Sequence, residues 1–276
     1  MNFSILSDTI NVKYEGNKIE SSDSYIYTRP HFKIKEDDFF LDIKNVARYR
    51  VQEGQTILVD PYENADKESV KLFLDGSALG ALLHQRGILP FHSSSFLYKD
   101  KGIMVCGDSG AGKSSLTAAF FQQGASFIND DITPVSISDP EITIIPVKTQ
   151  MKLWDDSLNK LNIDSNNLLR IRPKLNKFYL PMDKNISEHR LDQIFILSIH
   201  NKDEFMAIEL KGIDKYNVLR NQIYRKVYLR GMPEIQKKYF KQLFLLAKNI
   251  PVIRVTRPNI CEIDDTMRFI EKKIIL

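Results

Sequence analysis

Residues 102–131 read GIMVCGDSGAGKSSLTAAFFQQGASFINDD, and this stretch decides the fold. Gly107 to Ser114 match the pattern G-x-x-x-x-G-K-S/T at every fixed position. The apolar run at 103–106 predicts a buried strand before this loop, and the apolar positions of 116–124 share one face of a helix after it. A strand, a glycine-rich loop and a helix in this order are typical of a site for nucleotide phosphates.

Each part of the loop has a physical role in such a site. Glycines let the backbone wrap closely around phosphate oxygens, and the N-terminus of the helix adds the positive end of its dipole. Lys113 is expected to be accessible to solvent in the empty loop and to reach the outer phosphates of a bound nucleotide, and the Ser114 hydroxyl is expected to ligate Mg²⁺. No motif for a particular base follows, so we expect ATP or another NTP together with Mg²⁺. The predicted cofactor-binding residues are Gly107, Asp108, Ser109, Gly110, Ala111, Gly112, Lys113, Ser114 and Ser115.

Two adjacent carboxylates, Asp130 and Asp131, follow the next predicted strand. Magnesium bound to a nucleotide commonly takes a carboxylate ligand at the end of a strand beside the loop. Neighbouring side chains at the end of a strand alternate sides. One carboxylate is therefore expected to face the metal, while the other faces the hydroxyl that accepts the phosphoryl group and takes its proton.

A histidine is the second candidate for proton transfer. His92 lies on an extended segment that is expected to run beside the strand before the loop. There it can position the acceptor hydroxyl or assist proton transfer. His84, on the helix before it, is interpreted as structural.

Composition limits the class of protein. The chain has 276 residues, 43% of them hydrophobic and 27% charged, as is usual for a globular protein with a sizeable core. No signal peptide is evident, and no apolar run is long enough to span a membrane. Cys106 and Cys261 are far apart in the sequence and are expected to be reduced, which indicates a cytoplasmic protein without a membrane partner.

Positive charge is concentrated near the end of the chain. From Arg220 onward there are thirteen Lys or Arg residues against five Asp or Glu, although the whole chain has a net charge of only +4. Such a region either attracts an acidic or phosphorylated partner or is a solvated surface. No aromatic-interleaved nucleic-acid motif accompanies it, so no nucleic-acid partner is expected.

Hydrophobic patterns divide the chain into a β-rich region with a helix at 1–87 and a catalytic domain at 88–276. Alternation over 25–59 predicts a small antiparallel sheet, and 66–86 predicts a helix. Later strands are expected at 95–98, 103–106, 125–129, 134–138, 142–147, 194–199, 205–210 and 251–256, and helices at 152–161, 216–230, 233–249 and 264–274.

The motifs resemble the HPr kinase/phosphorylase superfamily. The segment Leu83–Ser95, the loop, and Phe127–Asp131 follow the order of that family: a histidine, a phosphate loop, and Asp-Asp after one helix. The chain is most similar to the HPr kinase-like proteins associated with lasso-peptide precursors, which share a Lys-Leu-Trp segment, here Lys152–Trp154, and a basic segment, here Arg170–Lys177.

This resemblance implies an α/β fold with a P-loop kinase core of the HPr kinase/PEP carboxykinase type, a mixed central sheet and a small N-terminal β-rich region. It implies a serine kinase in which Lys113 binds phosphate, Asp130 is the base and His92 lies at the acceptor. Ser114 and Asp131 would hold the metal. Ser115 stands where HPr kinases have a glutamate, and their signature for phosphorolysis is not found.

Three hypotheses stay open at this point. The first is a kinase for a serine on a peptide or protein, which includes the C-terminal serine of a lasso-peptide precursor. The second is a kinase for a small hydroxyl-bearing metabolite, and the third is a nucleotide-binding switch without catalysis. A peptide would be held by Arg170–Lys177 and by a helix bearing Arg220, Arg225 and Arg230. Self-association into a homo-oligomer also stays open.

Overall fold

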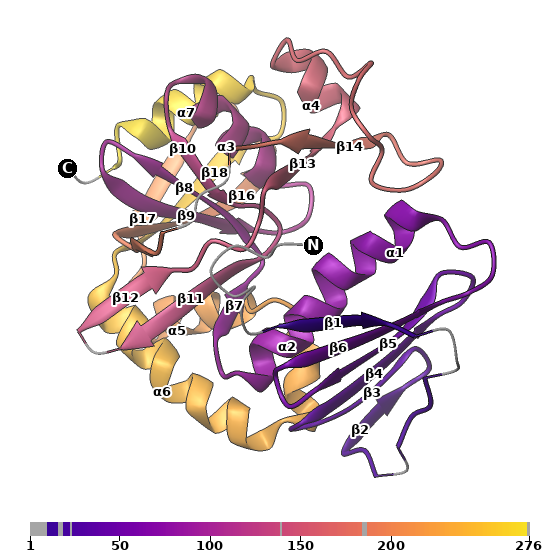
Figure 1. Cartoon of the computed structure of the whole chain (residues 1–276). Helices are drawn as coiled ribbons and strands as arrows, with labels where there is room; N and C mark the ends of the chain where they lie inside the picture. Colours follow the sequence, from indigo (N-terminus) through magenta and orange to yellow (C-terminus); the bar gives the residue numbers. More distant parts are fainter. Residues whose placement is uncertain (1–9, 16–18, 23, 139, 184–186, 275–276) are drawn as a thin grey trace.

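A computed structural model describes residues 10–15, 19–22, 24–138, 140–183 and 187–274. It has a mixed α/β architecture with several sheets (Figure 1). Among the described residues, no helix is long and apolar enough to cross a membrane.

The first part of the chain forms a six-stranded sheet in the order β1-β6-β5-β4-β3-β2. The strands β2 to β6 are antiparallel, as the alternation predicts, but β1 pairs with β6 in parallel. Those strands are β1 (Asn11–Tyr14), β2 (Tyr27–Arg29), β3 (Phe32–Lys35), β4 (Asp38–Ile43), β5 (Ala47–Gln52) and β6 (Thr56–Pro61).

One nearly continuous helix covers this sheet (Figure 1). It consists of α1 (Lys67–Phe73), a π-helical turn η2 (Leu74–Ala78) and α2 (Leu79–Gln85), which confirms the helix predicted at 66–86. The Asp66 side chain caps its N-terminus by accepting a hydrogen bond of 2.7 Å from the Ser69 N–H. Tyr228, from the later half of the chain, is buried in the same core. The domain boundary at residue 87 therefore stays a prediction.

The central sheet is mixed, with the order β10-β8-β9-β16-β18-β17. The hairpin of β8 and β9 leads into the phosphate loop, and β9 pairs in parallel with β16 on its other side. The strands are β8 (Ser93–Tyr98), β9 (Lys101–Gly107), β10 (Ser126–Asn129), β16 (Gln193–His200), β17 (Met206–Glu209) and β18 (Val252–Pro258).

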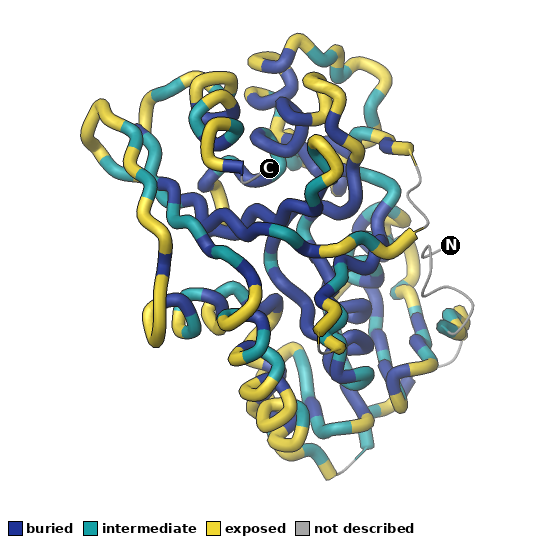
Figure 2. The backbone as a smooth tube through the Cα atoms, turned by 90° about the vertical axis from the view of Figure 1, so that its left-hand side faces the viewer, coloured by how far each residue is buried: buried dark blue, intermediate teal, exposed yellow. Residues whose placement is uncertain are grey.

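Helices cover both faces of the central sheet because its middle strands are apolar on both sides. In β9, Val105 packs into the core under α3 and α7, whereas Met104 packs into the core under α5 and α6. Figure 2 shows this sheet as a buried layer between more exposed helices. The helices are α3 (Lys113–Gln122), α5 (Gly212–Asn221), α6 (Pro233–Asn249) and α7 (Ile263–Glu271).

Two smaller sheets complete the fold. One has the order β15-β12-β11-β7, and the other is the hairpin of β13 and β14. Their strands are β7 (Leu89–Phe91), β11 (Thr133–Ser138), β12 (Glu141–Ile144), β13 (Gln150–Trp154), β14 (Lys177–Pro181) and β15 (His189–Arg190).

The prediction of a helix over 152–161 is wrong in its first part. The segment 152–154 belongs to strand β13, and only α4 (Asp155–Lys160) is helical. Lys152 pairs with Tyr179 and Leu153 with Phe178 across the hairpin. Pairing with a strand that is distant in the sequence overrides the helical preference of the local residue pattern.

The prediction of a single helix over 216–230 is also wrong. Helix α5 ends at Asn221, and after a short turn at 222–225 a 3₁₀ helix, η3 (Lys226–Gly231), begins. Ile223 in that segment forms a β-bridge with Phe91, and Arg225 has a left-handed backbone with φ of 50°. A continuous helix cannot accommodate this bridge to another element or the left-handed residue.

Candidate active site

The phosphate loop connects the end of β9 to the start of α3. Gly107 has a φ of 146°, and a Cβ atom there would lie 2.4 Å from the Leu197 carbonyl oxygen. Gly112, directly before the helix, has a φ of 102°. Only glycine fits both positions without strain, so the local backbone explains the spacing of these residues. The Gly107 N–H also donates to Oε1 of Gln222 at 3.0 Å.

The Lys113 side chain folds back over its own loop. Its ammonium group donates to the carbonyl oxygens of Gly107 at 2.8 Å and Asp108 at 3.1 Å, and it lies 3.3 Å from Nε2 of His92. The residue is 8% exposed, so the expectation that an empty loop leaves this lysine accessible to solvent is wrong. Burial lowers the pKa of Lys113.

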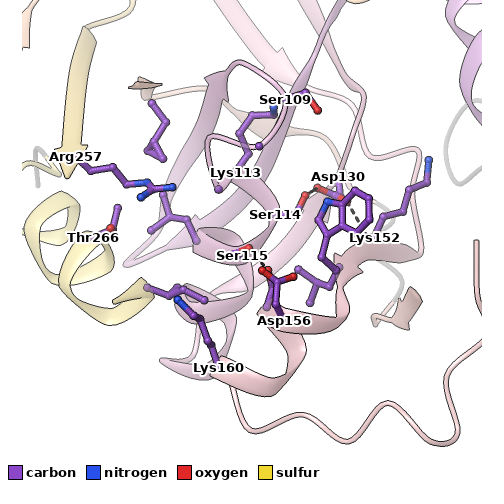
Figure 3. A pocket seen from close by; sticks show the side chains of 18 of the residues that line it. Ser109, Lys113, Ser114, Ser115, Asp130, Lys152, Asp156, Lys160, Arg257 and Thr266 are labelled. Atoms are coloured by element: carbon purple, nitrogen blue, oxygen red, sulfur yellow. Dashed lines mark hydrogen bonds between the residues drawn. The ribbon is translucent and has the colours of Figure 1, made fainter. Parts of the chain in front are cut away.

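Asp130 is tied to the N-terminus of α3. Its Oδ1 accepts hydrogen bonds from the hydroxyls of Ser114 at 2.7 Å and Ser94 at 2.6 Å. Its Oδ2 accepts from the Lys152 backbone N–H at 2.8 Å. Figure 3 shows Asp130 beside Ser114 at the start of the helix. Three hydrogen bonds fix this buried carboxylate next to the serine of the loop.

The Asp131 side chain points in a different direction from that of Asp130, because the Asp131 backbone is left-handed with a φ of 72°. Its Oδ2 lies 2.8 Å from the Lys152 ammonium, and its Oδ1 lies 3.6 Å from Nδ1 of His92. Burial alone would raise the pKa of the Asp131 carboxyl, but the charge of Lys152 holds this pKa well below its usual range. The carboxylate is therefore ionised at neutral pH, and the two aspartates contact different partners.

His92 lies between Lys113 and Asp131. Its Nδ1 is 3.1 Å from the Asp131 carbonyl oxygen, which can only accept, so Nδ1 carries the proton. Nε2 then accepts from the Lys113 ammonium. Two causes lower the pKa of His92: burial has the larger effect, and the nearby charge of Lys113 has the smaller one. The histidine is therefore neutral at physiological pH, in one tautomer.

A cavity of about 530 Å³ opens over the phosphate loop. Residues of α3, β13, α4 and the segment before α7 line it (Figure 3). Arg257 on β18 reaches over the loop and donates from Nε to the Ala111 carbonyl at 3.1 Å. Sequence reasoning missed Arg257, since an arginine on a distant strand has no local signal that connects it to the loop.

A second cavity, of about 610 Å³, lies on the other side of His92. Its walls include Leu72, Phe73, Gly76 and Ser77 of the helix and the segment Asn221–Arg225. Four residues line both cavities, namely His92, Ser109, Asp131 and Lys152. The two cavities therefore meet at the Asp131–His92 pair, and we name them the loop cavity and the acceptor cavity.

The arginines expected to hold a peptide do not act as one surface. Arg225 lines the acceptor cavity, where its guanidinium donates to the Ser77 hydroxyl at 3.2 Å. Arg220 and Arg230 line a third cavity on the other side of the same segment. Of the basic segment 170–177, Lys177 lines the loop cavity and packs over the Trp154 ring.

The oxygen atoms beside the loop suit a magnesium ion in their chemistry, since Mg²⁺ prefers hydroxyl, carboxylate and phosphate oxygens. Ser114 and Asp130 supply the first two kinds. In the described part of the chain, no group of three or more His, Cys, Asp or Glu side chains is placed to hold a metal.

The searches against protein-family models and against curated proteins gave no match. Among solved structures, the chain is similar to the Hpr(Ser) kinase/phosphatase from Coxiella burnetii, with a TM-score of 0.33 and 9% sequence identity. That similarity covers 66% of this chain and 91% of the other. The likeness is distant, and the geometry described above does not depend on it.

Proposed function

We propose that this protein is an ATP- and Mg²⁺-dependent kinase that phosphorylates a serine hydroxyl on a peptide or protein. The observation that carries the proposal is the meeting of the loop cavity and the acceptor cavity at Asp131 and His92. A phosphoryl donor in one cavity and a hydroxyl in the other would approach each other at an ionised carboxylate. A nucleotide-binding switch has no need of a second cavity at that point.

Asp130 and Ser114 are assigned to the metal. The buried Asp130 carboxylate already accepts from the Ser114 hydroxyl, so both groups lie at the end of the loop where the outer phosphates of a nucleotide bind. Bound Mg²⁺ supplies positive charge that offsets the charge developing on the transferred phosphoryl group. This reverses the roles that the resemblance implied for the two aspartates.

Asp131 is assigned to the acceptor hydroxyl. The transition state of phosphoryl transfer is largely loose, so the hydroxyl must be oriented well before it loses its proton. Asp131 accepts a hydrogen bond from that hydroxyl and takes the proton late in the transfer. Lys152 keeps this carboxylate ionised, and it also fixes Asp130 through its backbone N–H.

Lys113 and His92 complete the site. The Lys113 ammonium can exchange its bonds to loop carbonyls for phosphate oxygens without crossing the cavity, because it already lies at the loop. His92 is neutral and holds Lys113 from the acceptor side through Nε2. We assign His92 to alignment of the acceptor with the phosphoryl group, since its low pKa makes the neutral form dominant.

The test is a comparison of acceptors under one set of conditions. The purified protein is incubated with ATP and Mg²⁺ and either a peptide with a C-terminal serine, a peptide with an internal serine, free serine, or small polyols. We expect phosphate on a peptide, as detected by mass spectrometry. A value of kcat/KM for a free metabolite well above that for every peptide would favour a metabolite kinase instead.

A further inference from the structure

A third cavity, which we call the α5–α6 groove, lies on the molecular surface away from the loop cavity. It has a volume of about 590 Å³ and is formed by α5, α6 and the 3₁₀ helix η3. Its floor includes the apolar residues Ile223, Leu229 and Leu243. Phe240 on α6 lines the groove and is 61% exposed, and Phe244 is 62% exposed one turn later. Exposed aromatic residues beside an apolar groove are typical of an interaction site.

The rim of the α5–α6 groove is positively charged. Arg220, Lys226 and Arg230 line it, and within the described residues no Asp or Glu does. The hydrogen bonds of Lys226 and Arg230 go to neutral oxygens, those of Asn221 and Tyr27. These cations therefore keep their charge available, and an acidic ligand would be complementary to them.

The groove and the acceptor cavity lie on two sides of one segment. Residues 221–225 line the acceptor cavity, whereas Lys226, Val227, Leu229 and Arg230 line the groove, and Ile223 lines both. A backbone hydrogen bond holds this segment beside His92, because the Gln222 carbonyl accepts from the His92 N–H at 2.8 Å. A chain bound in the groove would thus lie close to the entrance of the acceptor cavity.

We propose that the α5–α6 groove docks an acidic segment with a bulky apolar side chain, from the same peptide or protein that presents the acceptor hydroxyl. This inference rests on the proposed kinase function. The apolar side chain packs beside Phe240, and the acidic side chains pair with the cations of the rim. The concentration of positive charge after residue 220 then has a specific role rather than only solvation.

Nucleic acid is less suited to this groove than an acidic peptide. The buried residues Ile223, Leu229 and Leu243 in its lining offer no hydrogen bond to a base edge. The cations line one short groove instead of an extended track that follows a phosphate backbone. A membrane would require a convex apolar surface, and this one is concave.

The test uses a fluorescent peptide, Asp-Glu-Leu-Asp-Phe-Glu, and a control in which lysine replaces each acidic residue. Binding is measured by anisotropy without ATP. The acidic peptide should bind more tightly, and the binding should weaken as salt rises. Arg220→Glu should weaken binding roughly tenfold, because it replaces attraction by repulsion. Phe240→Ser should also weaken it. Lys241→Glu is the matched control, since this exposed lysine of α6 does not line the groove, and it should have little effect.

Phosphorylation separates this inference from the proposed function. The acidic block fused before an acceptor serine should lower KM for the wild type but not for Arg220→Glu, while background ATP hydrolysis stays the same. The docking site would be overturned if the two peptides bound equally well, or if Arg220→Glu and Lys241→Glu weakened binding of the acidic peptide equally. It would also be overturned if a single-stranded oligonucleotide bound more tightly than the acidic peptide, or if the protein formed a dimer that depends on Arg220. Docking without transfer to any serine would instead contradict the kinase assignment.

Discussion

The Ser114 hydroxyl donates a hydrogen bond of 2.7 Å to Oδ1 of Asp130, whereas the neighbouring Asp131 pairs with Lys152. This relationship separates the two carboxylates by role. The first is buried at the end of the phosphate loop, and the second lies where the loop cavity meets the acceptor cavity. The proposed mechanism depends on that separation.

Substitution of the two aspartates should give different kinetic effects. Asp131→Asn should leave nucleotide affinity nearly unchanged and lower kcat by roughly 10²–10⁴-fold, the range for loss of a general base. Asp130→Asn should raise the Mg²⁺ concentration needed for half-maximal activity. Titration of Mg²⁺ and of labelled nucleotide checks both. If Asp131→Asn alone raised the Mg²⁺ requirement, the assignment would have to be exchanged.

Lys113→Ala should abolish measurable transfer while the protein remains folded. The lysine stabilises charge on the phosphoryl group, and loss of one such electrostatic contact lowers kcat by at least about 10²-fold. Its bonds to two loop carbonyls can be replaced by water, so the unfolding free energy should change by only about 1–2 kcal/mol. Thermal melting without nucleotide checks the stability. Lys177→Ala, in the same cavity, is the control and should reduce activity far less.

Charge reversal at Arg225 should raise KM for the acceptor and leave background ATP hydrolysis unchanged. Arg225 lines the acceptor cavity but not the loop cavity, so it contributes to binding of the acceptor and not of the nucleotide. The matched control is Lys241→Glu, because Lys241 is exposed and lines neither cavity. Steady-state kinetics with a serine peptide compares the two. Similar KM values for both variants would exclude Arg225 from acceptor binding.

His84 should make the fold less stable in mild acid. Burial lowers the pKa of His84 to about 4, below its ordinary value of 6.5. The unfolded chain therefore binds the proton first, and stability falls as pH decreases from about 6.5 to about 4. At about 1.4 kcal/mol for each pKa unit, the total loss is about 3 kcal/mol.

Urea unfolding at several pH values measures this loss. His84→Gln should be less stable at pH 7, because it disturbs the hydrogen bonds to Tyr239 and the Tyr224 carbonyl, yet it should show a smaller decrease in acid. An unchanged pH dependence in this variant would assign the acid sensitivity to other groups.

The loop and its strands could be predicted because their signals are local. The glycines of 107–112 are required by the loop backbone itself, and β8 and β9 are joined by a short turn. Strand β13 could not be predicted, because it is stabilised by β14, more than twenty residues later. The end of α5 was missed for a similar reason, since Ile223 pairs with the distant Phe91.

The loop, His92 and the two aspartates of the candidate site could be predicted, but their arrangement and several of their partners could not. Asp130 and Asp131 differ in direction through the left-handed backbone of Asp131, which no residue pattern indicates. Lys152 was noted only as part of a Lys-Leu-Trp segment, yet its ammonium holds one aspartate and its N–H the other. Gln222 reaches the loop from a segment that was expected to be helical.

The central claim is tested most directly by mass spectrometry. A serine peptide is incubated with ATP and Mg²⁺, together with either the wild type or the Asp131→Asn variant, and phosphate on the peptide is measured. We predict a phosphopeptide that forms with the wild type and requires Mg²⁺. With Asp131→Asn its formation should nearly stop, although the variant still binds ATP. Transfer at an unchanged rate in this variant would contradict a catalytic role for the residue between the two cavities. ATP binding by the wild type without transfer to any peptide or metabolite would contradict the kinase itself.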